Sequence, residues 1–353
     1  MSFDSDQSVE RFVCRFLEYR GAIIEKNTKG FNVLLPDHLS KLLQTPEFIQ
    51  IDTDPASESI CSVNYGSPLL EKMANETCES PPLVACHLHF DYLKSQGFDN
   101  LIRNQFAFHG AVGKVESFAE VRTEYLLLTC KYLAQSDEQK EGLIKLTFNL
   151  ETGARVADME QNIGLVVSEF QSKEKPVGWW DEKIKKIIEW VECHIKADLA
   201  EEIALFRDSM NRRLRRDVAS LEEYYSALEQ EMKASLERPG LSAKLIQERQ
   251  EKIGLLPDEL ARKIDDLFKK YSIRVNIKLC GAMLIHTPAV KVLYRVSVGR
   301  KQHRLSMIYN PANKFLDPQV CRSCGVSTFS VNFCRHLHLL CPNCSEQCPV
   351  CKK

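Results

Sequence analysis

The sequence lacks the features that mark membrane and secreted proteins. No apolar run approaches the roughly 20 residues that a membrane-spanning helix needs. The first residues, MSFDSDQSVE, are acidic and polar, unlike a secretory signal. Its 14 cysteines do not form a secreted disulfide framework, since seven of them lie at or after Cys321. We therefore expect a soluble intracellular protein, cytoplasmic or, if its source is eukaryotic, nuclear, with no membrane partner.

A complete catalytic motif is also missing. Gly110 and Gly113 are too close together for a phosphate-binding loop, and Val115 replaces the hydroxyl that would hold magnesium. His87-Leu-His89-Phe-Asp91 resembles the start of the metal motif of metallo-β-lactamase-like hydrolases, but Tyr92 stands where the next histidine belongs. A metal-dependent hydrolase is therefore the less favoured interpretation, with ordinary surface or core histidines as the alternative. We expect a protein that is not an enzyme.

Acidic residues are absent between Asp266 and Asp317, although the net charge of the chain is only -1. Of the 47 basic and 48 acidic residues, 14 basic and two acidic ones follow Asp266, which leaves -13 on residues 1–266. A basic lobe on an acidic body indicates a polyanionic partner, with nucleic acid as the first candidate. The alternative is docking of the lobe on the protein's own acidic half or on an acidic partner protein.

Hydrophobic periodicity predicts an α+β protein. The predicted segments are an α+β domain of unknown role over 1–172, a long antiparallel, coiled-coil-like helical hairpin over 178–271, a small basic antiparallel β-sheet of three strands over 272–316, and a zinc-binding module over 317–353. The three strands of the small sheet would be separated at His286-Thr287-Pro288 and at Gly299-Arg300-Lys301.

The first arm of the hairpin is predicted as one continuous helix. Apolar residues recur every three or four positions from Trp180 to Leu236, a length of about 85 Å at 1.5 Å per residue. Pro239-Gly240 would end it, and a much shorter return helix would run to Tyr271, broken or kinked at Gly254 and Pro257. Part of the apolar stripe would then stay uncovered. We expect internal packing, self-association or a protein partner to bury residues 181–238.

Two sets of basic residues are candidates for phosphate contacts. The first candidates, on the predicted basic sheet, are Arg295, Arg300, Lys301 and Arg304. The second set lies in a five-residue stretch of the predicted long helix and comprises Arg212, Arg213, Arg215 and Arg216. Arginine forms charge-assisted bonds with phosphate. The alternative for the helical set is a solvated helix face paired with acids such as Glu222 and Glu223.

The C-terminal segment has the spacing of metal ligands. Two thiolates separated by two residues can hold one ion, and the pairs Cys321/Cys324 and Cys341/Cys344 are sixteen residues apart, as in four-cysteine zinc sites. The candidate ligands are Cys321, Cys324, Cys334, His338, Cys341, Cys344, Cys348 and Cys351, with His336 competing for the place of His338. Closed sites of this kind are structural, so we expect zinc to stabilise folding rather than perform chemistry.

Written as C-x2-C-x9-C-x3-H-x2-C-x2-C-x3-C-x2-C, this segment resembles a RING-type cross-brace module over about a tenth of the chain. The resemblance implies two zinc ions, one on Cys321, Cys324, Cys341 and Cys344, the other on Cys334, His338, Cys348 and Cys351. Only three residues, Ser345 to Gln347, separate the last two pairs, so the likeness concerns the metal topology rather than a ligase surface. A zinc ribbon followed by an extra Cys-x2-Cys knuckle is a closely related arrangement of ligands.

These patterns lead to three functional hypotheses. The first is a non-enzymatic, zinc-stabilised protein that binds nucleic acid or a partner in a nucleic-acid-processing assembly. The second is an accessory or adaptor subunit of a helicase-like ATPase, because the arginine-rich helix followed by a basic sheet is faintly similar to C-terminal regions of Swi/Snf-type ATPases. The third is a RING-type ubiquitin ligase. The sequence does not distinguish DNA from RNA.

Overall fold

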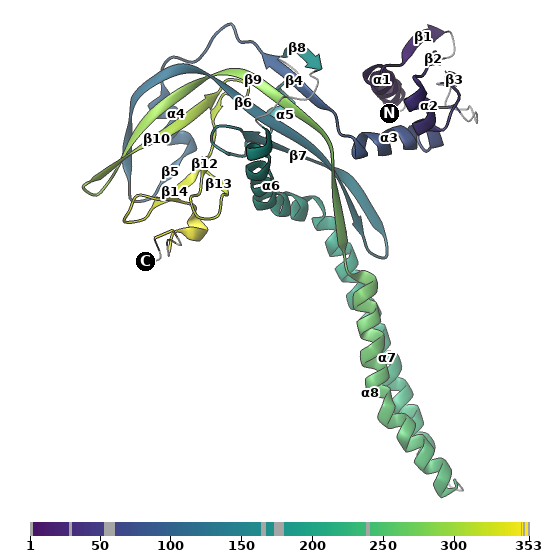
Figure 1. Cartoon of the computed structure of the whole chain (residues 1–353). Helices are drawn as coiled ribbons and strands as arrows, with labels where there is room; N and C mark the ends of the chain where they lie inside the picture. The colour runs from purple at the N-terminus through teal and green to yellow at the C-terminus, as the bar shows by residue number, and fades with distance from the viewer. Residues whose placement is uncertain are drawn as a thin grey trace. The chain divides into compact units, whose positions relative to one another are not determined.

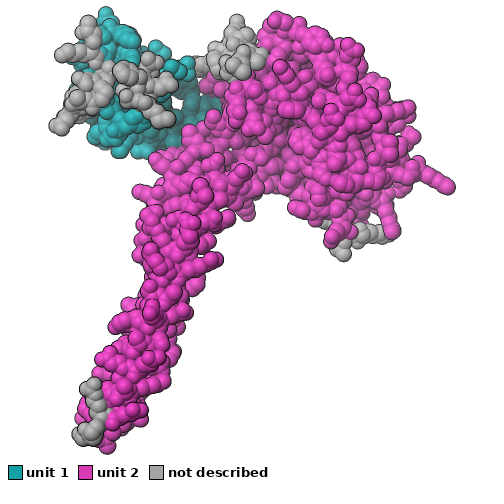
Figure 2. All heavy atoms as spheres, turned by 180° about the vertical axis from the view of Figure 1, so that it is seen from behind, with its two compact units in different colours: residues 1–83, 279–282 teal, residues 84–278, 283–353 magenta. Residues whose placement is uncertain are grey.

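The structure is a computed structural model in which helices and strands are mixed, as the α+β prediction requires. It describes residues 3–27, 30–52, 61–163, 167–172, 180–237, 241–346, 348 and 350–351. Two compact units are present, unit 1 (residues 1–83 and 279–282) and unit 2 (residues 84–278 and 283–353) (Figure 2). None of the described helices combines the length and apolar composition needed to cross a membrane.

Unit 1 packs three helices against a three-stranded antiparallel sheet of order β1-β2-β3. Its elements are α1 (Phe3–Tyr19), β1 (Ile23–Asn27), β2 (Gly30–Leu34), α2 (Asp37–Leu43), β3 (Phe48–Asp52) and α3 (Pro68–Glu79). The core joins Val13 and Leu17 of α1 to Val33, Ile51 and Met73, all almost fully buried. Helix α3 is capped by Ser67, which precedes it and whose side chain accepts a hydrogen bond from the backbone N–H of Leu70.

Unit 2 is built on a seven-stranded sheet (Figure 1). Its strands are β4 (Leu83–Leu88), β6 (Val112–Gln135), β7 (Gln139–Asn149), β8 (Val167–Ser172), β9 (Arg274–Val298), β10 (Lys301–Asn310) and β11 (Phe315–Leu316). The order is β11-β10-β9-β4-β8, and β6 pairs with both β7 and β9. Strand β9 therefore lies in the middle of this sheet.

The separate three-stranded sheet predicted over 272–316 is wrong. Its residues form the two long strands β9 and β10, which belong to the larger sheet through the pairing of β9 with β4 and β6. The chain does not turn at His286-Thr287-Pro288, because β9 continues through these residues. Pairing with β10 stops at Val290, so Pro288, which has no N–H to donate, lies just beyond the stretch that β10 occupies.

The remaining elements of unit 2 are helices around the sheet and short strands near the C-terminal end. The helices are α4 (Phe98–Gln105), α5 (Met159–Ile163), α6 (Trp180–Glu202), α7 (Ala204–Leu236) and α8 (Ala243–Tyr271). The short elements are β5 (Ala107–Phe108), β12 (Gln319–Val320), β13 (Ser327–Thr328), β14 (Ser330–Phe333), β15 (Leu339–Leu340) and the 3-10 helix η1 (Pro342–Cys344). Helices α7 and α8 lie side by side, which is compatible with the predicted hairpin (Figure 1).

The single long helix predicted from Trp180 to Leu236 is interrupted at Ile203. The backbone of Ile203 leaves helical geometry, with φ -96° and ψ 7°, and its side chain is buried. Helix α6 packs on β7 whereas α7 packs on α8, so the two halves of the predicted apolar stripe contact different elements. The interruption at Ile203 does not change the three-to-four spacing of apolar residues, so the sequence gives no sign of it. On α6 the stripe is only partly covered, because Ile184 and Ile188 remain 43% and 50% exposed, whereas Ile187 is buried.

The return helix also differs from its prediction. Helix α8 has 29 residues against 33 in α7, and it continues through Gly254 and Pro257. Pro257 faces solvent, so its ring removes a backbone hydrogen bond without disturbing the packing against α7. The predicted stop at Pro239-Gly240 lies outside the described residues.

Candidate metal centre

The eight predicted ligands lie in turns between the short strands of the C-terminal segment. Cys321 and Cys324 follow β12, Cys334 and His338 connect β14 to β15, Cys341 precedes η1, and Cys344 is the last residue of η1. The last pair, Cys348 and Cys351, closes the segment. Because each pair is held by a tight turn, both of its side chains can face one point.

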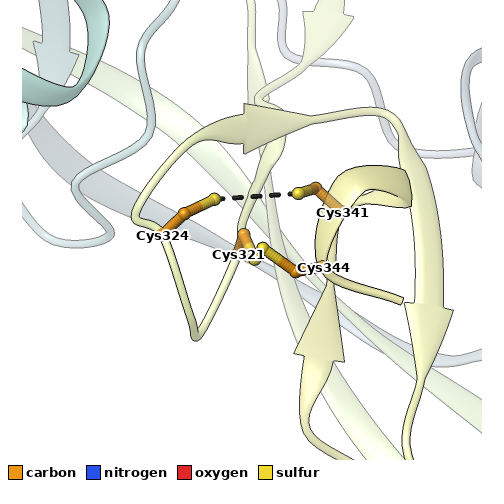
Figure 3. A group of neighbouring side chains, drawn as sticks. All are labelled: Cys321, Cys324, Cys341 and Cys344. Atoms are coloured by element: carbon orange, nitrogen blue, oxygen red, sulfur yellow. Dashed lines mark hydrogen bonds between the residues drawn. The ribbon is translucent and has the colours of Figure 1, made fainter. Parts of the chain in front are cut away.

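The first group consists of Cys321, Cys324, Cys341 and Cys344, whose sulfur atoms all lie within 4.8 Å of one another. Figure 3 shows their side chains pointing toward a common centre. The sulfurs of Cys324 and Cys341 are 3.7 Å apart. Two sulfurs bound tetrahedrally at about 2.3 Å from zinc are about 3.8 Å apart. The spacing of this group therefore fits a zinc ion.

The second group consists of Cys334, His338, Cys348 and Cys351. His338 Nδ1 lies 3.4 Å from the sulfur of Cys334 and 3.7 Å from that of Cys348. Tetrahedral zinc bonds of about 2.3 Å to sulfur and about 2.0 Å to nitrogen place these atoms about 3.5 Å apart. His338 belongs to this group and His336 does not, so the competition between the two histidines is decided for His338.

The two groups interleave along the chain, as the RING-type resemblance implies. The first and third pairs form one group, and the second and fourth pairs form the other. Each group supplies four ligand atoms, the full coordination of a structural zinc site. The segment can therefore hold two metal ions in closed sites, which leave no position for a substrate.

Hydrogen bonds prepare some of these thiols to bind a cation. Burial opposes ionisation of Cys321, but backbone N–H groups of Cys324, Cys341 and Ser323 outweigh it and lower the pKa of its thiol to about 7. Burial and the neighbouring thiols raise the pKa of Cys324 to about 12. The thiolate of Cys321 thus forms readily, whereas the neighbouring thiol of Cys324 resists ionisation. A divalent cation offsets the repulsion between the negative sulfurs, because it stabilises all the thiolates together.

The metal segment is joined to the rest of unit 2 by strand pairing and by two backbone-to-side-chain hydrogen bonds. Strand β14 pairs in parallel with β5 through Ser330 and Val331. The backbone N–H of Arg155, after β7, donates to the Ser327 hydroxyl at 2.7 Å. On α6, His194 Nε2 accepts the backbone N–H of Ser327 at 3.1 Å. The sequence analysis missed His194, because a single histidine on a helix carries no signal of the strand it meets.

The contacts of His194 identify its protonation state. Since Nε2 accepts from Ser327, the ring proton lies on Nδ1, which donates to the carbonyl of Trp190 at 2.7 Å. Burial lowers the pKa of this histidine, an effect reinforced by Arg155 and opposed by the Trp190 carbonyl and Asp198. Protonation of Nε2 would remove the acceptor that Ser327 uses.

The attachment of the metal segment should therefore weaken in acid. With its pKa lowered on folding, His194 contributes stability that is complete above its unfolded value of about 6.5 and is lost as the pH falls toward its folded value. We expect the protection factor of the Ser327 amide, its intrinsic exchange rate divided by its observed rate, to fall relative to its value at pH 7.5 as the pH drops below 6.5. His194→Gln should remove this dependence, and an equal response in both proteins would contradict it. Because the unaltered protein and His194→Gln are compared at the same pH, any effect of cysteine titration is common to both and cancels.

The candidate hydrolase residues do not form a metal site. His87 stacks on His286 with ring centres 4.6 Å apart, and His286 Nδ1 lies 3.2 Å from Glu124. These residues, with His89 and Asp91, line a cavity of about 980 Å³. Among the described residues, however, only the two C-terminal groups bring three or more potential ligands close enough to share an ion.

The first basic set is partly neutralised and partly exposed. Arg295 and Arg304 both pair with Glu116, Arg304 through Nε at 2.8 Å. Arg300 is exposed in the turn between β9 and β10. Lys301 donates from Nζ to the backbone carbonyl of Arg335 at 2.7 Å. The turn therefore lies beside the metal segment, and Arg335 joins the set, which no spacing in the sequence could reveal.

The arginines of α7 are divided between ion pairs and solvent. Arg213 pairs with Glu138, in the turn between β6 and β7, at 2.7 Å, and Arg216 pairs with Asp217 at 3.0 Å. Arg212 and Arg215 are exposed. The pairing of a helix face with acids is confirmed for two of the four, although the printed partners are not Glu222 and Glu223. Arg213 helps to fix the base of the α7–α8 hairpin on the sheet.

Comparison with known proteins adds no family to these observations. No protein-family model matches the sequence, and no curated protein matches it. Any function must therefore be argued from the geometry of the residues themselves.

Proposed function

We propose that this is a non-enzymatic, zinc-stabilised protein that binds nucleic acid through a basic surface, formed by the β9–β10 turn and the adjoining metal segment. The observation that carries the proposal is the hydrogen bond from Lys301 Nζ to the carbonyl of Arg335. It joins two stretches of chain, 34 residues apart, whose exposed side chains are mostly cationic. We call the exposed residues Arg300, Lys301, Arg304 and Arg335 the basic surface.

The charge of the basic surface is not cancelled by its described neighbours. Glu116 is shared between Arg295 and Arg304, so one carboxylate faces two guanidinium groups. The side chain of Arg304 remains 72% exposed. Lys301 bonds to a carbonyl, which leaves its positive charge in place. An excess of exposed cations on one face is the electrostatic footprint of phosphate binding.

Metal binding and the basic surface are linked through Arg335. This arginine lies between the ligands Cys334 and His338, in a turn where the N–H of Leu337 donates to the carbonyl of Cys334. An ion held by Cys334 and His338 would fix the carbonyl of Arg335 that Lys301 contacts. Zinc would therefore shape the surface without touching phosphate.

Fluorescence polarisation with labelled DNA and RNA in increasing salt tests the proposal. We expect affinity to fall steeply with salt, and the triple variant Arg300→Ala, Lys301→Ala, Arg335→Ala to bind at least tenfold more weakly with a salt slope smaller by about two to three. The matched control removes Lys41, Lys233 and Lys269, three exposed lysines in (i,i+4) helical pairs, and should bind normally. Absence of binding at low salt, or an affinity that ignores salt, would remove the proposal.

A second candidate is an accessory subunit of a helicase-like ATPase, for which the α7–α8 hairpin supplies the supporting observation. Large apolar side chains are exposed along it: Leu205 is 82%, Leu255 60% and Phe268 55% exposed. Such positions suit contact with another protein or with a second copy of the chain. Pull-down with the intact protein should recover a motor protein, and recovery should fail with polar substitutions at these three positions.

For the ubiquitin-ligase alternative, an autoubiquitination assay should be negative.

A further inference from the structure

Two cysteines outside the metal groups meet in unit 1. Cys78 lies in the last turn of α3, and Cys280 belongs to the short stretch of β9, residues 279–282, that is part of this unit. Their sulfur atoms are 2.9 Å apart, although 202 positions separate the residues in the sequence. Such a contact between distant segments is a feature of the folded protein alone.

The surroundings favour a bond between these sulfurs. A disulfide bond is about 2.05 Å long, so less than 1 Å of approach separates the two thiols from bonding. Next to them, the backbone N–H of Ala282 donates to the carbonyl of Pro82 at 2.9 Å, which holds the two segments together. Both side chains are partly exposed, so a small oxidant can reach them.

We propose that Cys78 and Cys280 form a reversible disulfide, which makes this pair a site of oxidative modification by low-molecular-weight disulfides of the glutathione type. The thiolate of one cysteine attacks glutathione disulfide, forms a mixed disulfide and releases one glutathione thiolate. The second protein thiolate attacks the protein sulfur of that mixed disulfide and releases the second glutathione. The protein loses two protons and two electrons, and the oxidant is reduced to two thiols.

The bond would make a non-covalent contact of unit 1 covalent for as long as the pair stays oxidised. It closes a loop of about 200 residues, and long closed loops restrict the unfolded chain most. The oxidised protein should therefore keep residues 279–282 on α3 under conditions that release them in the reduced protein. This property is independent of nucleic-acid binding.

The test uses the full, zinc-loaded protein equilibrated with glutathione and glutathione disulfide, followed by alkylation and peptide mass spectrometry. We expect a linked pair of peptides containing Cys78 and Cys280, a loss of about 2 Da, and slower hydrogen exchange at 279–282. In Cys78→Ser, Cys280 should stop at the mixed glutathione disulfide, and Cys280→Ser should leave Cys78 in the same state. Cys14→Ser, also a partly buried cysteine of unit 1, should oxidise like the unaltered protein.

Other outcomes overturn the proposal. Separate glutathione adducts on Cys78 and Cys280 in the unaltered protein would show that the two sulfurs do not react together. Links from either residue to a cysteine of the metal groups, with a parallel loss of zinc, would show that oxidation follows unfolding instead. If one serine variant does not fold, the other variant and the peptide link in the unaltered protein still decide the question.

Discussion

Replacement of His338 by alanine is expected to release one metal ion, unfold the surrounding turns and lower the affinity for nucleic acid at least tenfold. The reason lies in what holds the segment together. Its buried cluster contains one ordinary apolar residue, Leu340, and otherwise consists of the metal-group cysteines. Structural zinc in small modules contributes on the order of 10 kcal/mol to folding, which no other contact of this cluster replaces.

His336 provides a matched control, because it is two residues away, exposed and outside both metal groups. Native mass spectrometry should find two zinc ions in the unaltered protein and in His336→Ala, and no more than one in His338→Ala. Hydrogen exchange should show the loss of protection confined to residues 319–351, with β6 and β7 unaffected. Equal metal content in the two variants, or no zinc in the unaltered protein, would contradict the assignment.

Gly153→Ala is expected to be among the most destabilising single-methyl changes in unit 2. Gly153 has φ +75°, a conformation that costs an L-residue about 1–2 kcal/mol. An added Cβ would also lie 2.7 Å from the Trp190 ring of α6, closer than real Cβ contacts. The tight approach joins the turn after β7 to α6, so the methyl group must push the helix away. We expect a loss of about 3 kcal/mol or more in unfolding free energy.

Gly110→Ala separates backbone strain from the clash with Trp190. Gly110 has φ +69°, and an added Cβ there meets no atom within 4 Å. Its cost should stay near the 1–2 kcal/mol of strain alone. Urea unfolding followed by tryptophan fluorescence and circular dichroism gives both values. Similar losses of unfolding free energy in Gly153→Ala and Gly110→Ala would mean that the Trp190 ring moves aside at little cost and does not hold α6 in place.

The metal groups were predictable from the sequence because their chemistry requires short, fixed spacings. A knuckle such as Cys341-Pro-Asn-Cys344 is local, so residue types and gaps suffice to indicate it. The interleaving of pairs also followed, through the RING-type resemblance. The choice between His336 and His338 needed the turn at Leu337, where φ is +62° and only one of the two imidazoles is brought to the sulfurs.

The errors came from features that have no local signal. The spacing of apolar residues is the same on both sides of Ile203, so it could not show that α6 packs on the sheet and α7 on α8. Likewise Pro288 looked like a strand end, whereas β9 only changes its partners near that position. The contact between Lys301 and Arg335 depends on how the β9–β10 turn meets the metal segment, which is a property of the tertiary fold.

The composition of unit 1 bears on how the chain acquires its structure during synthesis. Residues 1–83 emerge from the ribosome before residues 279–282, which belong to the same unit and in which Ala282 donates its backbone N–H to the carbonyl of Pro82. About 195 residues must be translated in between, some 10–40 s at typical rates. During that interval unit 1 lacks residues 279–282. The carbonyl of Pro82 therefore cannot yet accept its hydrogen bond from Ala282.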